Sequence, residues 1–343
     1  MLVCYALFRY YKKVNKRALR ADLLLLLTAG LWGFGFVAQS SGMDYVGPFT
    51  FNALRFPLGS FSLLPFILFL KTKGRLSTLP DIPVKSQLKL TLLTGIILFV
   101  AVMFQQIGMI FTTVGKAGFI TGFYVVLTPV FGIFIGKKTG LPTWIGMVFA
   151  VAGLYFIFAA GTVSSVNPGD IIILISAAFW ALHILIIDNF VQKIDPLVLS
   201  AGQFAWCGIF FFAAAFTLEP FVADWALKIA GEITVQQWTP IKELFAIISG
   251  GAFFDHPVSG AVIPILYGGL ASVGIAYTLQ VVAQKDAPPA HATIILSLEG
   301  CFAVFGGMLL RNEKPGSFTV LGFGFMLAAM VITQWDVIRK NKI

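Results

Sequence analysis

Long apolar runs, separated by short segments rich in glycine, proline and charge, dominate this chain of 343 residues. Crossing a membrane takes roughly 20 mainly apolar residues, because each helical residue rises about 1.5 Å through a hydrocarbon core of about 30 Å. The runs do not alternate between apolar and polar positions, which excludes a transmembrane β-barrel. We predict ten membrane-spanning helices, over residues 22–40, 49–70, 90–112, 117–136, 143–160, 170–188, 197–217, 261–282, 289–310 and 316–335.

Composition and charge support a membrane protein of defined orientation. Only 11% of the residues are charged, against about 25% in soluble domains. With the N-terminus inside, 18 of the 24 Lys and Arg residues lie in inner segments, five lie in outer segments and Arg55 lies within a span. This positive-inside bias places both termini in the cytoplasm and the protein in the inner (plasma) membrane. The net charge of +9 is therefore topological and indicates no nucleic-acid partner.

An internal repeat relates the two halves of the chain at an offset of 148 residues. Each half contains five predicted spans, an odd number, so the second half enters the membrane from the opposite side. Inverted repeats are typical of secondary transporters, whose binding site lies near the midplane between the repeats. The alternative is a duplicated membrane scaffold or sensor that transports nothing. Six residues recur at this offset: Asp22, Ala29, Trp32, Pro48, Ala53 and Phe56 match Asp170, Ala177, Trp180, Pro196, Ala201 and Phe204.

The predicted organisation is thus an all-α membrane protein of ten transmembrane helices in two inverted five-helix repeats. An interfacial helix over IKELFAII (241–248) and a disordered loop are equal alternatives for part of the long outer loop. The segments are a basic cytoplasmic N-terminal segment (1–21), a first repeat (22–160), an outer linker (161–169), a second repeat (170–336) with the long outer loop 218–260, and a cytoplasmic tail (337–343).

Three stretches carry a family resemblance: AGLWG (29–33), KAGFITGFYVVLTPVF (116–131) and LQVVAQKDAPPAHATIILSLEGCF (279–302). With the five-plus-five layout, they resemble the drug/metabolite transporter superfamily, in its ten-span branch with two EamA domains, over about residues 22–335. The resemblance implies a transporter of amino acids, related metabolites or drugs, often an exporter. Two departures stand out: Glu299-Gly300 replaces the usual Glu-Pro pair, and Lys137-Lys138 replaces a glutamate whose second-half counterpart is Glu313.

Two charged residues at membrane depth are the main candidates for the site. Glu299 lies about 15 Å into its span and Arg55 about 9 Å into its own, at 1.5 Å per residue. A charge at that depth is costly and usually functional. For Arg55 the alternative is snorkelling to the outer interface; for Glu299 it is a protonated or hydrogen-bonded acid that stabilises the fold. The stem of Arg55 is long enough for the two to pair.

The remaining candidates are polar and aromatic side chains within spans, which bind substrate or simply link helices. The sequence contains no HExxH, P-loop or GxSxG motif, so we predict neither an enzyme nor a cofactor or metal. Expected partners are a small-molecule substrate and membrane lipid, with a proton as coupling ion, in a monomer or homodimer. The full candidate set for substrate binding or coupling is Glu299, Arg55, Trp32, Trp180, His183, Gln203, Gln106, Asn52, Tyr124, Tyr277 and Gln280.

Overall fold

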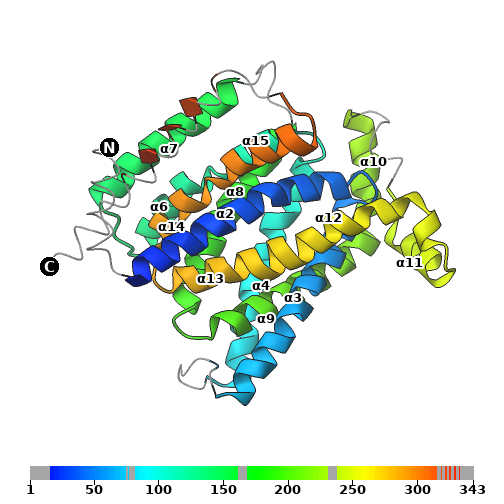
Figure 1. Ribbon diagram of the computed structural model, residues 1–343, viewed down its shortest axis with the longest axis horizontal. Coiled ribbons are helices and arrows are strands. Elements are labelled where there is room, and N and C mark those ends of the chain that lie inside the picture. The colour runs from blue at the N-terminus through cyan, green and yellow to red at the C-terminus, as the bar shows by residue number, and fades with distance from the viewer. Residues whose placement is uncertain are drawn as a thin grey trace.

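The computed structural model describes residues 16–74, 76, 82–160, 168–230 and 238–314, with scattered residues between 318 and 332. Within these residues every regular element is a helix (Figure 1). The elements are α2 (Lys16–Gly42), α3 (Pro48–Thr72), α4 (Val84–Gly108), α5 (Val114–Thr121), α6 (Tyr124–Phe134), α7 (Leu141–Ala160), α8 (Pro168–Phe190), α9 (Pro196–Thr217), α10 (Glu219–Ala230), α11 (Ile241–Ser249), η2 (Phe253–Asp255), η3 (Pro257–Ala261), α12 (Val262–Leu266), η4 (Tyr267–Tyr277), α13 (Thr278–Gln284), α14 (Pro289–Leu296) and α15 (Glu299–Leu310).

Eight helical segments are long and apolar enough to cross a membrane, and they coincide with eight of the ten predicted spans. The predicted fifth span forms α7, whose apolar stretch Leu141–Gly153 is shorter. Most of the predicted tenth span, the segment 1–15, most of the linker and the tail lie outside the described residues. Large apolar side chains such as Phe61, Phe66 and Phe69 are exposed on α3, as expected of a surface that faces lipid rather than water.

Proline and short polar side chains fix where several helices begin. Pro48, Pro196 and Pro289 occupy the first turns of their helices, where a missing N–H costs nothing. Asp195 caps α9, because its Oδ1 accepts the Leu197 N–H at 2.8 Å. Proline and aspartate residues that separate the predicted spans in the sequence therefore mark the first residues of helices.

Three predicted spans are each one helical segment of spanning length, but they contain local irregularities. The span 117–136 is split into α5 and α6 around Gly122 and Phe123, and the span 289–310 is split into α14 and α15 around Ser297 and Leu298. The span 261–282 contains a π-helix, η4. The backbone through both turns stays hydrogen-bonded: the Phe123 N–H donates to the Ile120 carbonyl at 3.1 Å and the Leu298 N–H to the Ile295 carbonyl at 3.2 Å. π-helical segments such as η4 are frequent at functional sites.

The helices pack so that the two broken segments meet. α15 packs on α2 and on α5, while α14 packs on α2 and α6. α3 lies along α9, and α4 lies along α8 and α9 (Figure 1). Gly118 and Gly300 allow α5 and α15 to approach closely: a Cβ on Gly118 would stand 2.6 Å from the Ala303 Cβ. A Cβ on Gly300 would stand 3.3 Å from the Gly118 carbonyl oxygen, so the close approach favours glycine after Glu299.

The two ends of the bundle are named here by the predicted orientation. The outer end carries the α2–α3 turn and the segments 218–230 and 238–261, and α10 and α11 both lie toward the right-hand side of Figure 1. The helical alternative for 241–248 is confirmed by α11. Trp238 Nε1 donates to the Met43 carbonyl at 2.7 Å, and the Glu219 carboxylate accepts the N–H groups of Phe49 and Thr50. The segment is thereby fastened to the start of α3.

Candidate functional site: a cavity between the two halves

A small enclosed cavity lies where the two halves meet. Its volume is about 20 Å³, enough for about one water molecule. α2, α3, α4, α5 and α6 border it from the first half, and α8, η4 and α15 border it from the second. The lining residues are Trp32, Phe36, Gln39, Arg55, Gln105, Thr121, Tyr124, Trp180, Ile184, Ser272, Tyr277 and Glu299.

Arg55 enters the cavity from α3 and is 1% exposed, so the structure places it inside the bundle and not at the interface. Its Nε donates to Asn52 Oδ1 at 2.7 Å and its Nη2 to Gln39 Oε1 at 3.0 Å. The guanidinium also lies over the rings of Phe51 and Phe56, at 5.4 and 5.1 Å from their centroids. Among the described residues, no carboxylate forms an ion pair with it.

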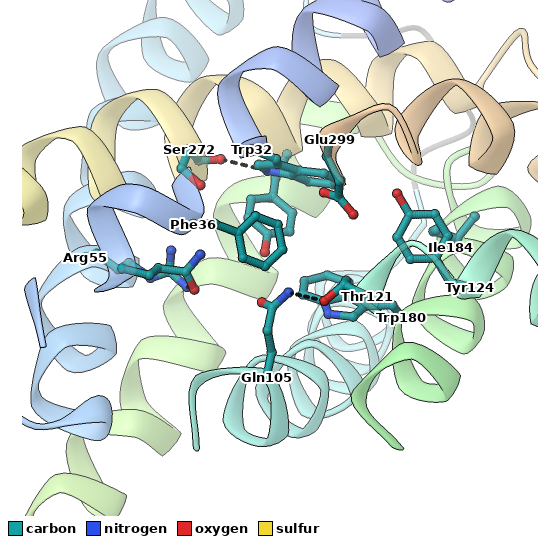
Figure 2. A pocket seen from close by; sticks show the side chains of 12 residues that line it. Trp32, Phe36, Arg55, Gln105, Thr121, Tyr124, Trp180, Ile184, Ser272 and Glu299 are labelled. Atoms are coloured by element: carbon teal, nitrogen blue, oxygen red, sulfur yellow. Dashed lines mark hydrogen bonds between the residues drawn. The ribbon is translucent and has the colours of Figure 1, made fainter. Parts of the chain in front are cut away.

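Glu299 is the first residue of α15 and Tyr124 is the first residue of α6, so both stand at helix breaks. Glu299 is 3% exposed, and its Oε1 has no hydrogen-bond partner among the described residues. In Figure 2, Arg55 lies on one side of the cavity and Glu299 and Tyr124 lie on the other. The predicted direct pair between Arg55 and Glu299 does not form.

Three aromatic side chains form a wall between these charges. The Trp32 ring lies 4.6 Å from that of Tyr277 and 6.2 Å from that of Trp180, between centroids. Trp180 stacks on Tyr277 at 5.8 Å. The Trp32 Nε1 donates to the Ser272 carbonyl at 3.3 Å (Figure 2). The cavity thus presents a cationic side, an anionic side and an aromatic face.

Five predicted residues do not line the cavity. Asn52 supports Arg55 from behind and donates to the Pro48 carbonyl at 2.7 Å. Gln106 is buried on α4, and neither of its amide atoms has a partner among the described residues. His183 and Gln203 bond to each other at 2.8 Å between α8 and α9. Gln280 Nε2 donates to Gln284 at 2.9 Å.

Several lining residues are not in the predicted candidate set. Gln39 lies near the end of a predicted span, where a polar residue carries no signal. Gln105, and not the neighbouring Gln106, faces the cavity and donates to Thr121 Oγ1 at 3.1 Å (Figure 2). Ser272 belongs to the π-helix, which the apolar pattern does not reveal. Among the described residues, no group of three or more His, Cys, Asp or Glu is placed to hold a metal ion.

Polar contacts join the two halves at the outer end. Lys116 pairs with Asp170 at 2.5 Å. Glu313, the glutamate kept from the family pattern, accepts the N–H groups of Val114 and Gly115 at 2.8 and 3.1 Å. It therefore caps α5 from the other half.

The inner end has its own contacts between the halves. His291 at the start of α14 bonds to Asp22 at 2.7 Å. Lys137, which stands where the family pattern has a glutamate, pairs with Asp188. The two halves of the bundle are therefore in contact at the outer end and at the inner end, with the cavity between them.

Similarity to known proteins identifies the family of this chain. The sequence profile of the EamA-like transporter family matches residues 19–159 and again residues 167–335. The chain belongs to the EamA-like transporter family. The resemblance to EamA transporters within the drug/metabolite transporter superfamily is therefore confirmed, with the EamA-like domain present twice.

Two relatives of this EamA-like chain come from Archaeoglobus fulgidus, and both are described as uncharacterized transporters. One is 28% identical over 94% of this chain and 88% of its own length; the other is 24% identical over 92% and 97%. A solved crystal structure, described only as that of a protein, has a TM-score of 0.67 at 16% identity, covering 93% of this chain and 98% of that one. The relatives are transporters by name, and the structural likeness shows the fold.

Proposed function

We propose that the protein is a secondary transporter that moves a small zwitterionic organic solute, of the amino-acid class, across the inner membrane by alternating access. The observation that supports this most strongly is that a buried guanidinium, Arg55, and a buried carboxyl group, Glu299, line one cavity without an ion pair to any described residue. A buried charge without a partner is costly, and a substrate carrying a carboxylate and an ammonium group meets both Arg55 and Glu299.

Arg55 is suited to hold the substrate carboxylate. A guanidinium has five N–H donors in a planar fork that matches a carboxylate. Among the residues that the structure describes, Arg55 donates two hydrogen bonds to side chains. Asn52 and Gln39 fix the group from two different helices. The remaining donors are free to take a bidentate anion.

Glu299 is suited to hold the ammonium group. A carboxylate buried near the midplane does not stay charged and unpaired, so it binds either a cation or a proton. When the ammonium group leaves, a proton takes its place, which gives exchange of protons for substrate. The aromatic face of Trp32, Trp180 and Tyr277 accommodates the apolar part of the solute.

The closed cavity supports alternating access. Its volume of about 20 Å³ excludes an amino acid, so the bundle must open to admit one. The contacts between halves offer one lock at each end: Lys116–Asp170 outside and His291–Asp22 inside. Opening one lock while the other holds exposes the site to one side at a time. The termini are proposed to lie in the cytoplasm.

The direction proposed is export, which comes from the resemblance to the superfamily. The test is counterflow in proteoliposomes with a panel of amino acids, nucleosides, polyamines and cationic drugs. Accumulation of labelled amino acids, with nucleosides and polyamines excluded, supports the proposal. Absence of flux across the panel, from protein that unfolds cooperatively, would favour a scaffold or sensor. Uptake by inverted membrane vesicles, driven by a proton gradient, measures export.

A further inference from the structure

A second polar cluster in the inner half of the bundle comprises three fully buried side chains: Ser200 and Gln203, about one turn apart on α9, and His183 on α8. His183 Nε2 lies 2.8 Å from Gln203 Oε1. The other polar atoms, His183 Nδ1, Gln203 Nε2 and Ser200 Oγ, have no partner among the described residues. We infer that Ser200, Gln203 and His183 form a second substrate station, through which the zwitterion passes between the central cavity and the cytoplasm.

A purely structural role does not account for this cluster. Each buried polar group left without a partner costs about 1–3 kcal/mol, and polar side chains that only link helices are normally satisfied. Such satisfied links exist nearby: Ser176 Oγ donates to the Ala101 carbonyl and Gln284 Nε2 donates to the Ile184 carbonyl, both at 2.9 Å. Three unpartnered atoms in one cluster therefore indicate a polar ligand that is present only during part of the cycle.

The position of the cluster mirrors that of Arg55. The offset of 148 residues aligns Asn52 and Arg55 with Ser200 and Gln203. Arg55 is the eighth residue of α3 and Gln203 is the eighth residue of α9, so each lies about 10 Å from the start of its helix. α3 starts at the outer end and α9 at the inner end. In both halves, this side chain bonds to the preceding long helix: Arg55 to Gln39, and Gln203 to His183.

The cluster adjoins the cavity through Trp180. This ring forms part of the cavity wall (Figure 2), and its centroid lies 5.8 Å from that of His183. A solute that leaves the cavity past Trp180 toward the inner end meets the three side chains next.

The chemistry of the cluster suits both ends of a zwitterion. Gln203 Oε1 only accepts hydrogen bonds, so His183 Nε2 carries the proton and Nδ1 of the neutral imidazole is an acceptor. His183 Nδ1 therefore takes an ammonium N–H, while Gln203 Nε2 and Ser200 Oγ donate to a carboxylate. These bonds lack the fixed charge that Arg55 supplies, and neutral hydrogen bonds are about half as strong as charge-assisted ones. Such a station holds the solute briefly and releases it.

The inference rests on the proposed function, so its first test needs no substrate. In a variant with the native cysteines replaced, Ser200→Cys, a change of one atom, is treated with a membrane-impermeant thiol reagent from each side. We expect labelling from the inner side. The control is Ile209→Cys on the same helix, whose side chain is 55% exposed on the lipid-facing surface and should stay unlabelled. Labelling no faster than in this control overturns the inference and leaves the proposed function standing.

The second test uses the transported amino acid. Gln203→Leu keeps the size of the side chain and removes its donor, so KM for substrate offered from the inner side should rise about five- to tenfold, as expected for one lost neutral hydrogen bond. KM from the outer side should change much less. An unchanged inner KM overturns the inference. If the wild type transports no amino acid, the proposed function fails, and the labelling experiment still decides whether a path passes Ser200.

Discussion

The most quantitative prediction concerns Glu219, which lies outside the membrane-spanning helices and fastens the outer segment to α3. Its carboxylate accepts the Phe49 N–H at 2.8 Å, the Thr50 N–H at 2.7 Å and the Thr50 hydroxyl at 2.5 Å. A hydrogen bond contributes about 0.5–1.5 kcal/mol, or more with a charged partner. Glu219→Ala should therefore lower the free energy of unfolding by roughly 2–5 kcal/mol. This loss is reduced by the desolvation penalty of the buried carboxylate, which is absent from the alanine variant.

The matched control is Glu219→Gln. Its amide oxygen can accept both backbone N–H groups and its NH₂ can donate to the Thr50 hydroxyl oxygen, so every contact survives without the charge. By thermal unfolding in detergent, Glu219→Ala should lower Tm by roughly 2–10 °C, at about 1–2 °C per kcal/mol for a chain of this length. Glu219→Gln should leave Tm near or above that of the wild type at neutral pH.

The pH dependence has a definite sign. Burial raises the pKa of Glu219, against a smaller lowering by the bonds from Thr50 and Phe49. The folded protein therefore binds this proton at a pH where the unfolded chain has lost it, and the stability due to Glu219 falls as pH rises through that window. Relative to Glu219→Gln, the wild type should lose Tm from about pH 4.5 upward. An Ala variant that melts like the wild type, or a difference that runs the other way with pH, would refute this reasoning.

Three further predictions test the cycle. Glu299→Gln should abolish net pH-driven flux. If substrate exchange survives in this variant, the carboxylate binds protons alone. If the variant keeps the flux and pH dependence of the wild type, Glu299 has only a structural role. A cysteine in 218–260 should label from outside and one in 72–88 from the cytoplasm, and the reverse pattern would overturn the orientation. Lys116→Asp and Asp170→Lys should each lower Tm. The double variant, which restores the ion pair with its charges exchanged, should be more stable than the sum of the two losses by at least 0.5 kcal/mol, about the lower bound of coupling for contacting residues. Strictly additive losses would show that the two residues do not hold the outer end closed.

The sequence predicts the helices well because the membrane imposes a simple rule. Runs of about 20 apolar residues have no other stable form there, and eight candidate spans follow the predicted ranges. Arg55 and Glu299 stand out for the same reason, since a charge within such a run is rare. The depth of a residue along its helix can therefore be predicted from the sequence.

The direction in which a side chain points is much harder to predict. Span helices are apolar all round, so periodicity gives no buried face, and neighbouring residues differ by about 100° around the helix. That rotation is why Gln105 lines the cavity and Gln106 does not. The breaks at Gly122 and Ser297 lack a local signal as well: Pro129 lies inside α6 without ending it, and the interruptions depend on packing between distant helices.

The central claim is that Arg55 holds the carboxylate of a zwitterion whose ammonium group meets Glu299. The most direct measurement compares an amino acid with its decarboxylated amine as competitors of transport, in the wild type and in Arg55→Ala. Charge-assisted bonds to a carboxylate are worth about 1.5–3 kcal/mol each, so the wild type should prefer the amino acid about a hundredfold. In correctly folded Arg55→Ala that preference should disappear. A variant that still distinguishes the two competitors as the wild type does would contradict the account.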